Sequence, residues 1–264
     1  MLKLAVIGKD VSKSDSGRMH TFILRGLGED CTYEHISSTA EAFDENAKKL
    51  LSEYDAFNVT IPYKLDIIPY LKRIEGDAVA FGAVNTVKDG VGYNTDGEGF
   101  ALMLKNNGIE PAGEKVLVLG AGGAGRSVVK KLLDAGAEVY LYDLKRESAE
   151  EVCKEFHGCN LLEKVLPAPY YMIVNVTGVG MHKTEGLSPV GEDIIGCCRV
   201  AVDLIYWPRK SEFLRIAESL GKKIVNGEGM LFYQAYFADC IYLGRRPSAK
   251  EAGALFEKYM EERQ

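Results

Sequence analysis

Apolar and polar residues alternate along the first hundred positions in the periods of strands and helices. Short apolar runs predict strands at residues 2–8, 31–36, 56–60, 83–87 and 91–94. Apolar residues spaced three and four apart predict a helix within residues 39–54. Strands that alternate with helices are typical of parallel sheets covered by helices.

A second stretch with the same pattern begins after Asn106-Asn107-Gly108, which is a helix-ending signal. Apolar runs predict strands at residues 115–119, 138–142, 171–176, 200–204 and 223–225. A helix is expected over residues 211–220, and two more, over 229–243 and 248–263, end the chain. The predicted fold class is α/β, with two domains that contain parallel sheets, the second of Rossmann type.

The run Gly120-Ala121-Gly122-Gly123-Ala124-Gly125 follows one strand directly and opens a helix. In this context glycines permit a tight turn and close approach of the backbone to a pyrophosphate, which the helix N-terminus attracts. We therefore predict dinucleotide binding at Gly120, Ala121, Gly122, Gly123 and Ala124.

Asp143 ends the next predicted strand, where an acidic residue binds the adenine ribose. A carboxylate there would repel a ribose 2′-phosphate by about 1–4 kcal/mol at about 4 Å, depending on the dielectric. The cofactor is thus NAD or NADP, with NAD favoured by Asp143. Lys145 and Arg146 are close enough in sequence to hold a phosphate.

Four polar segments of the first stretch carry more hydroxyls, amides and charges than packing needs: 12–16, 58–64, 82–86 and 92–97. Ligands of open parallel sheets bind outside the carboxyl ends of the strands, where at least the first, second and fourth segments are expected. Lys64 and Asp96 are their titratable pair, and such a pair can pass a proton to a substrate oxygen. A surface lysine and a helix N-cap aspartate explain the same spacing equally well.

Composition and charge narrow the class of protein. The 264 residues hold 32 Lys and Arg against 38 Asp and Glu, a net charge of −6, which argues against nucleic-acid or anionic-membrane partners. The start of the chain is too short for a signal sequence, and no apolar run reaches the length of a membrane span. The six cysteines and four histidines show no metal-ligand spacing. We expect a cytoplasmic protein without a metal.

Taken together, the motifs resemble the shikimate dehydrogenase family across nearly the whole chain. They are N-V-T-I-P-Y-K at 58–64, A-V-N-T at 83–86, N-T-D at 94–96, G-A-G-G-A at 120–124, N-x-T-x-x-G-M at 175–181 and G-x-x-M-L-x-x-Q at 227–234. The resemblance implies an NAD(P)-dependent oxidoreductase that interconverts 3-dehydroshikimate and shikimate in aromatic amino acid biosynthesis. It also implies a substrate-binding catalytic domain at 1–100, on which the terminal helices (229–264) pack, and a dinucleotide-binding domain at 101–228.

The resemblance also assigns roles to individual residues. Lys64 and Asp96 match the catalytic pair, and Ser14 and Ser16 match the hydroxyls that bind the substrate carboxylate. Residues expected around the ring hydroxyls are Asn58, Thr60, Asn85, Tyr206 and Gln234. Thr177 and Gly227 are expected beside the cofactor.

Several positions depart from the family pattern. Lys13 stands where the family has His before the first serine, and Gly17 where it has Pro after the second; Thr21 follows His20 where the family has Asn. Asp143 begins a segment that resembles NAD-preferring relatives, several of which also oxidise quinate. An NAD-dependent quinate/shikimate dehydrogenase is therefore the alternative, and a non-catalytic ligand-sensing relative is a weaker one because Lys64 and Asp96 are both present. The partner is a small molecule, and the protein is expected to be a monomer or a homodimer.

Overall fold

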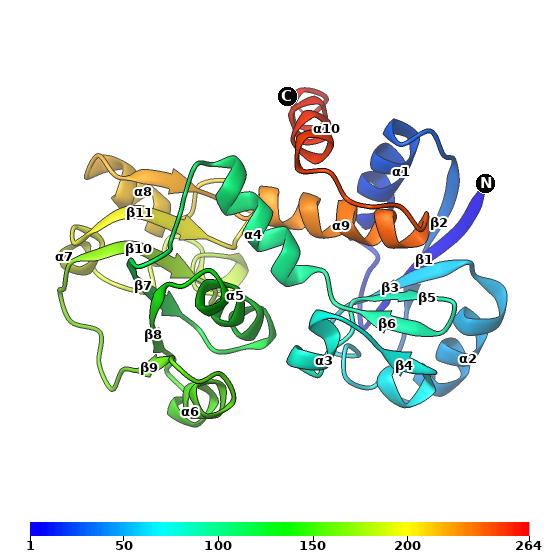
Figure 1. Cartoon of the computed structure of the whole chain (residues 1–264), viewed down its shortest axis with the longest axis horizontal. Helices are drawn as coiled ribbons and strands as arrows, with labels where there is room; N and C mark the ends of the chain where they lie inside the picture. Colours follow the sequence, from blue (N-terminus) through cyan, green and yellow to red (C-terminus); the bar gives the residue numbers. More distant parts are fainter. Residues whose placement is uncertain (264) are drawn as a thin grey trace. The chain divides into compact units, whose positions relative to one another are not determined.

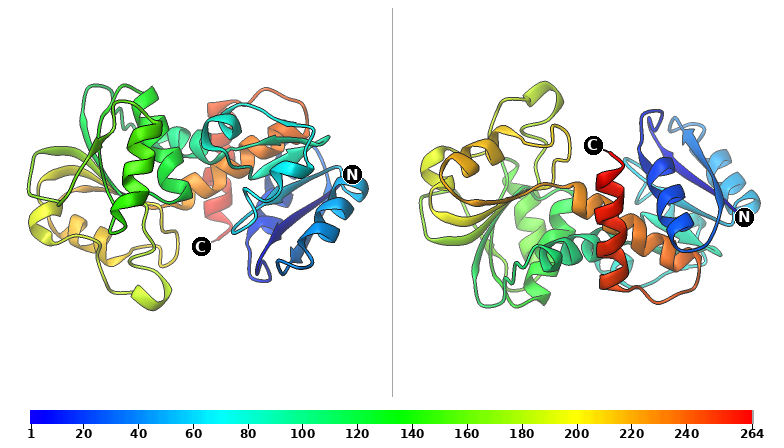
Figure 2. Two further views of the ribbon diagram at one scale, coloured as in Figure 1. Left: turned by 90° about the horizontal axis from the view of Figure 1, so that it is seen from below. Right: turned by 90° about the horizontal axis from the view of Figure 1, so that it is seen from above.

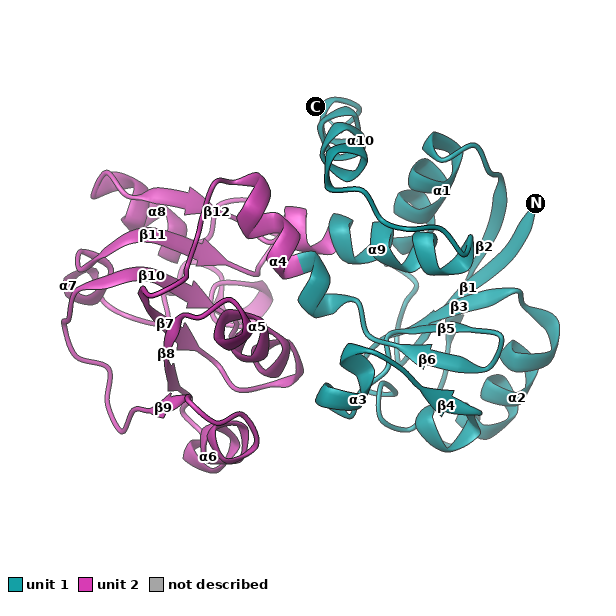
Figure 3. Cartoon of the chain, viewed as in Figure 1, with its two compact units in different colours: residues 1–99, 232–264 teal, residues 100–231 magenta. Residues whose placement is uncertain are grey.

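The computed structural model describes residues 1–263, which form an α/β protein with two six-stranded sheets (Figure 1). The chain divides into two compact units: unit 1 comprises Met1–Gly99 and Phe232–Gln264, and unit 2 comprises Phe100–Leu231 (Figure 3). The division falls inside two helices, α4 (Asp96–Asn106) and α9 (Glu228–Tyr242). The predicted α/β class is confirmed, while the role expected for each domain stays a prediction.

The sheet of unit 1 has the strand order β2-β1-β3-β5-β6-β4. Its strands are β1 (Leu2–Gly8), β2 (Cys31–Ser37), β3 (Ala56–Val59), β4 (Arg73–Ile74), β5 (Thr86–Lys88) and β6 (Val91–Tyr93). β1 pairs in parallel with β2 and with β3, as the alternating pattern predicts.

The β5–β6 hairpin is a feature that the predicted parallel sheet lacks. β5 runs antiparallel to both β3 and β6, so β6 runs in the direction of β3. Asp89 and Gly90, with φ of 53° and 75°, make the turn, as Asp-Gly does in tight hairpins. As a result the carboxyl ends of β1, β3 and β6 and the amino end of β5 meet at one edge, which brings all four polar segments there.

Helices cover the unit 1 sheet on both faces: α1 (Ser16–Gly26), α2 (Phe43–Glu53), α3 (Asp77–Phe81), the second half of α9 and a short 3-10 turn, η1 (Ile68–Tyr70). A further helix, α10 (Ala249–Glu261), packs against α1. On α2, Phe43, Ala47 and Leu50 are buried against Ile7 and Phe57 of the sheet. Each buried Leu or Phe contributes about 1.5–3 kcal/mol of hydrophobic free energy. On the other face α10 lies beside α1 (Figure 2). The Phe22 and Tyr259 rings meet there edge to face, with centroids 5.1 Å apart.

The sheet of unit 2 is parallel throughout, in the order β12-β11-β10-β7-β8-β9. Its strands are β7 (Lys115–Leu119), β8 (Glu138–Tyr142), β9 (Asn160–Leu161), β10 (Tyr170–Asn175), β11 (Cys198–Asp203) and β12 (Lys223–Val225). The helices are α5 (Gly123–Asp134), α6 (Arg146–Glu155), α7 (Glu192–Ile195), α8 (Glu212–Ser219) and the 3-10 turn η2 (His182–Thr184). Strand order reverses between β7 and β10, the place where doubly wound sheets bind ligands. Among residues 1–263 no helix is long and apolar enough to cross a membrane.

Candidate active site

Lys64 and Asp96 form an ion pair at the polar edge of unit 1. The ammonium of Lys64, in the turns after β3, donates to Asp96 Oδ2 at 2.6 Å, and Asp96 is the first residue of α4. Their side chains are 26 % and 14 % exposed, so water is largely but not wholly excluded. The structure thus brings together the two residues that the sequence could assign only as a possible pair.

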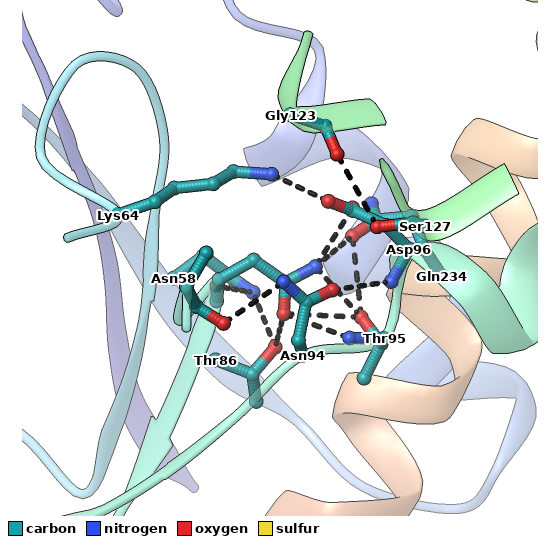
Figure 4. Close-up of polar contacts among 11 residues, drawn as sticks. Asn58, Lys64, Thr86, Asn94, Thr95, Asp96, Gly123, Ser127 and Gln234 are labelled. Atoms are coloured by element: carbon teal, nitrogen blue, oxygen red, sulfur yellow. Dashed lines mark hydrogen bonds and ion pairs between the residues drawn. The ribbon is translucent and has the colours of Figure 1, made fainter. Parts of the chain in front are cut away.

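Asn85 connects this ion pair to a network of neutral polar groups (Figure 4). Its Nδ2 donates to Asp96 Oδ1 at 2.9 Å and to Thr95 Oγ1 at 3.0 Å. Its Oδ1 accepts from the hydroxyl of Thr86 and from the Thr95 backbone N–H. Gln234 of α9 faces the same amide, with its Oε1 3.4 Å from Asn85 Nδ2. Because one oxygen of Asp96 is held by Asn85 and the other by Lys64, the carboxylate has a fixed orientation.

Asn58 of β3 lies next to this network and is 7 % exposed. Its Nδ2 donates to the backbone oxygen of Asn85 at 3.3 Å. Its Oδ1 accepts from the hydroxyl of Tyr33, on β2, at 2.8 Å.

The two serines lie where β1 passes into α1. Ser14 Oγ donates to Ser16 Oγ at 2.8 Å and accepts from the Ser16 backbone N–H at 3.2 Å. Ser16 is the first residue of α1, and both side chains are half-buried. Thr60 follows β3 and packs against Gly8, where a Cβ would lie 2.5 Å from its methyl group. Six predicted substrate residues of unit 1 (Ser14, Ser16, Asn58, Thr60, Asn85 and Gln234) therefore lie on neighbouring elements around the Lys64–Asp96 pair.

Three further members of the network were not predicted: Tyr33, Thr86 and Thr95. The two threonines stand inside motifs that the sequence analysis quotes, beside Asn85 and Asp96, and adjacency to those residues was a usable signal. No sequence signal pointed to Tyr33, because a tyrosine inside a strand is ordinarily a packing residue.

The glycine-rich turn of unit 2 has the shape that the sequence predicts. A Cβ on Gly120 (φ 111°) would crowd Thr177 at 3.1 Å, and a Cβ on Gly125 would lie 2.3 Å from the carbonyl oxygen of Gly120. By contrast, nothing lies within 4 Å of a Cβ on Gly122 or Gly123. Gly122 precedes α5 and no side chain caps that helix, so its first N–H groups face open space that fits an anionic group.

Asp143 closes this turn from the end of β8. Its Oδ2 accepts from the Ala121 backbone N–H at 2.7 Å, and its Oδ1 accepts from the Lys145 N–H at 2.7 Å. Arg146 forms exposed ion pairs with Glu150 and Glu163, which it would have to leave or share in order to hold a phosphate. Asp143 therefore shapes the turn in addition to any contact with a ribose.

Thr177 belongs to a second turn, after β10, that a buried carboxylate supports. Its hydroxyl and backbone N–H both donate to Asn175 Oδ1, and Asn175 Nδ2 donates to Asp203 Oδ1 at 3.0 Å. Asp203 also accepts from the Ser211 hydroxyl and the Ile205 N–H. Burial raises the pKa of the Asp203 carboxyl to about 6, although these hydrogen bonds oppose the rise.

The last two predicted residues lie in unit 2 on the segments after β11 and β12. Gly227 is required by packing, since a Cβ there would lie 2.1 Å from the Leu204 carbonyl oxygen. Tyr206 is 48 % exposed and belongs to a different unit from the other predicted substrate residues. The structure therefore does not join Tyr206 to the unit 1 network, and its role stays a prediction.

Comparison with known proteins agrees with the motif pattern. Residues 6–87 match a family model described as the shikimate dehydrogenase substrate binding domain. The shikimate dehydrogenase (NADP(+)) of Carboxydothermus hydrogenoformans is 35 % identical over 93 % of this chain and 92 % of its own. That of Thermus thermophilus is 37 % identical over 94 % of each chain.

Comparison of the fold with solved structures identifies the same family of relatives. The crystal structure of Thermus thermophilus shikimate 5-dehydrogenase in complex with NADP(H) and shikimate has a TM-score of 0.86 at 34 % identity, covering 98 % of this chain and 99 % of that one. These relatives carry NADP(+) or NADP(H) in their names, so a nicotinamide cofactor is supported but the preference for NAD is not confirmed. From its motifs, fold and relatives, this chain belongs to the shikimate dehydrogenase family.

Proposed function

We propose that this protein is a shikimate dehydrogenase, an oxidoreductase that interconverts 3-dehydroshikimate and shikimate with a nicotinamide cofactor. The observation that best supports the proposal is the Lys64–Asp96 ion pair. Neutral hydrogen-bond donors and acceptors surround this pair, and the chain belongs to the shikimate dehydrogenase family. A polyhydroxylated ring acid needs many such neutral partners, and a site built from them rejects analogues that lack a hydroxyl.

Lys64 is the proton donor in this mechanism. A nicotinamide cofactor, when bound, would supply the hydride for the carbonyl carbon in reduction and would accept it in oxidation. In reduction the Lys64 ammonium donates a proton to the carbonyl oxygen, which becomes the alcohol. In oxidation the uncharged Lys64 amine takes that proton back. Asp96, held by Asn85 on its other oxygen, keeps the amine aimed and stabilises its charged form.

The remaining residues of unit 1 bind the substrate. Ser14 and Ser16 bind its carboxylate, for which the α1 N-terminus adds a favourable dipole. Asn58, Thr60, Asn85 and Gln234 bind the ring hydroxyls, and Tyr206 adds a further contact from unit 2. The open glycine turn after β7 holds the pyrophosphate of the cofactor, with Thr177 and Gly227 on its nicotinamide side.

The proposal includes a preference for NAD. The Asp143 carboxylate stands at the end of β8, where an adenine ribose would lie, and the nearby Arg146 is occupied by Glu150 and Glu163. A 2′-phosphate would meet this negative charge, and Arg146 could offset it only by giving up its pairs with these carboxylates. The protein is proposed to act in the cytoplasm, as a monomer or a homodimer.

Steady-state kinetics of the purified protein test the function. Shikimate and quinate are each offered with NAD and with NADP, and kcat/KM is measured for the four pairs. The proposal expects the highest kcat/KM with shikimate and NAD. A higher value with quinate would favour the quinate/shikimate dehydrogenase alternative, and no turnover with any pair would support a non-catalytic ligand-sensing relative.

A further inference from the structure

A buried chain of side chains leads from α9 to the substrate-binding amide of Asn58. It starts at Asp239, whose Oδ1 lies 2.6 Å from His20 Nδ1 of α1. The two side chains are 0 % and 2 % exposed, so neither is part of the surface. A charged or polar pair this deeply buried is costly unless it holds a specific arrangement in place.

The arrangement that this pair holds is the ring of Tyr33. The His20 imidazole stacks on the phenol with ring centroids 5.0 Å apart and planes 14° from parallel. On the same helix Gly17 has no side chain, and a Cβ there would lie 3.3 Å from Tyr33 Cδ1 and 2.9 Å from His35 Cε1. Gly17 therefore leaves room first for the His35 ring and then for the Tyr33 ring against α1.

The Tyr33 hydroxyl is the polar end of this chain and faces the site. It donates to Asn58 Oδ1 at 2.8 Å, the shortest hydrogen bond that Asn58 makes through its side chain. The two bonds on the Nδ2 side, to the Asn85 oxygen and the Thr86 hydroxyl, are longer, at 3.3 and 3.4 Å. Tyr33 thus fixes which end of the amide is the acceptor, and the second lone pair of Asn58 Oδ1 remains for a ligand hydroxyl to donate to.

We propose that Tyr33 is a positioning residue for substrate recognition, which acts through Asn58, and that the His20–Asp239 pair holds Tyr33 in place. The inference rests on the proposed function, because it takes Asn58 as a substrate-binding residue. It assigns a purpose to a buried histidine and aspartate that have no part in the proton transfer.

The variant Tyr33→Phe keeps the stacked ring and removes only the hydroxyl. We expect its KM for shikimate to rise about threefold to tenfold, the effect of one neutral hydrogen bond. Its kcat should stay within twofold and its KM for the cofactor should not change, since the Lys64–Asp96 pair is untouched. In an Asn58→Ala background, the rise caused by Tyr33→Phe should be clearly smaller than in the wild type, because most of its effect passes through that amide; the Tyr33 hydroxyl also interacts with the Ser16 side chain.

Tyr236→Phe is the matched control for loss of a buried hydroxyl. Tyr236 Oη donates to Glu251 and accepts from the Ser248 N–H, both at 2.8 Å, on the α10 side of α9. The control should lower thermal stability at least as much as Tyr33→Phe while leaving KM for shikimate at the wild-type value. A purely structural role for Tyr33 would make the two variants behave alike.

The His20–Asp239 pair is tested by Asp239→Ala and Asp239→Asn. Alanine removes the partner of His20 and should reproduce the higher KM, whereas asparagine keeps an oxygen for Nδ1 and should restore most of the wild-type value. If Asp239→Ala does not fold, Asp239→Asn and Tyr33→Phe carry the test. Two results would overturn the inference: an unchanged KM for shikimate in Tyr33→Phe, or a rise in that KM that is equal in the wild-type and Asn58→Ala backgrounds. If the wild-type protein still turns over shikimate, the proposed function stays intact. A wild-type protein that does not turn over shikimate would instead overturn both.

Discussion

The Asp143 carboxylate accepts a hydrogen bond from the backbone N–H of Ala121, so the residue that directly follows β8 is tied to the glycine turn after β7. The same negative charge stands where the ribose of a bound dinucleotide is expected. One side chain therefore influences both the shape of the turn and the choice between NAD and NADP.

Asp143→Asn removes the charge and keeps one acceptor oxygen, which can still accept from either the Ala121 or the Lys145 N–H but not from both. We expect the ratio of kcat/KM for NADP to that for NAD to rise about tenfold, equivalent to about 1.4 kcal/mol of relieved repulsion. Asp134→Asn, at an exposed ion pair with Lys130 on α5, is the matched control and should leave the ratio unchanged. A cofactor ratio in Asp143→Asn equal to that of the wild type would refute this role.

Two alanine substitutions in the glycine turn should affect different properties: one should lower thermal stability, and the other should weaken cofactor binding. Gly125→Ala places a Cβ 2.3 Å from the Gly120 carbonyl oxygen, and overpacking against backbone should lower the Tm by at least about 4 °C. Gly122→Ala meets nothing within 4 Å and has φ of −69°, so its Tm should stay near that of the wild type. If a pyrophosphate lies over Gly122, the new methyl group should nevertheless raise KM for the cofactor about tenfold. An unchanged cofactor KM in Gly122→Ala would place the pyrophosphate elsewhere.

The buried Asp203 should make stability depend on pH. Its pKa is raised from 3.8 to about 6 in the folded protein, so the folded state binds the proton more tightly than the unfolded state. Stability from this group is present below about pH 4 and is lost as pH rises through 6, a loss of about 3 kcal/mol. Asp203→Asn does not titrate and should lack this component. Urea unfolding at pH 4 and pH 7 measures it, and an identical pH dependence in both proteins would contradict the assignment.

The regular elements of the fold were predictable where the pattern was long enough. β1, β7 and β8 were predicted with the bounds that the structure shows, because each is an apolar run ended by glycine or a polar residue. α1 received no prediction, since its buried face includes Gly17 and His20, which break the apolar period. β4 and α3, with two and five residues, are too short to leave a pattern.

The structure brings several predicted site residues close together, but the contacts between them were not predictable, and their roles stay predictions. Lys64 and Asp96 are 32 positions apart, and only the antiparallel β5–β6 hairpin brings the end of β6, and with it Asp96, to the edge where β3 ends. Strand direction depends on tertiary pairing, which one sequence does not contain. The contact of Tyr33 with Asn58 likewise depends on the register of β2 and β3 on either side of β1.

The account depends most on Lys64 as the group that donates the proton in reduction and accepts it in oxidation, and Lys64→Ala tests that role most directly. The measurement is kcat for shikimate oxidation at saturating cofactor, together with the dissociation constant for shikimate from direct binding. We predict that kcat falls by a factor of about one hundred or more, the size of a general acid–base contribution, while shikimate binding is largely kept. A variant whose kcat stays near that of the wild type would contradict the central claim.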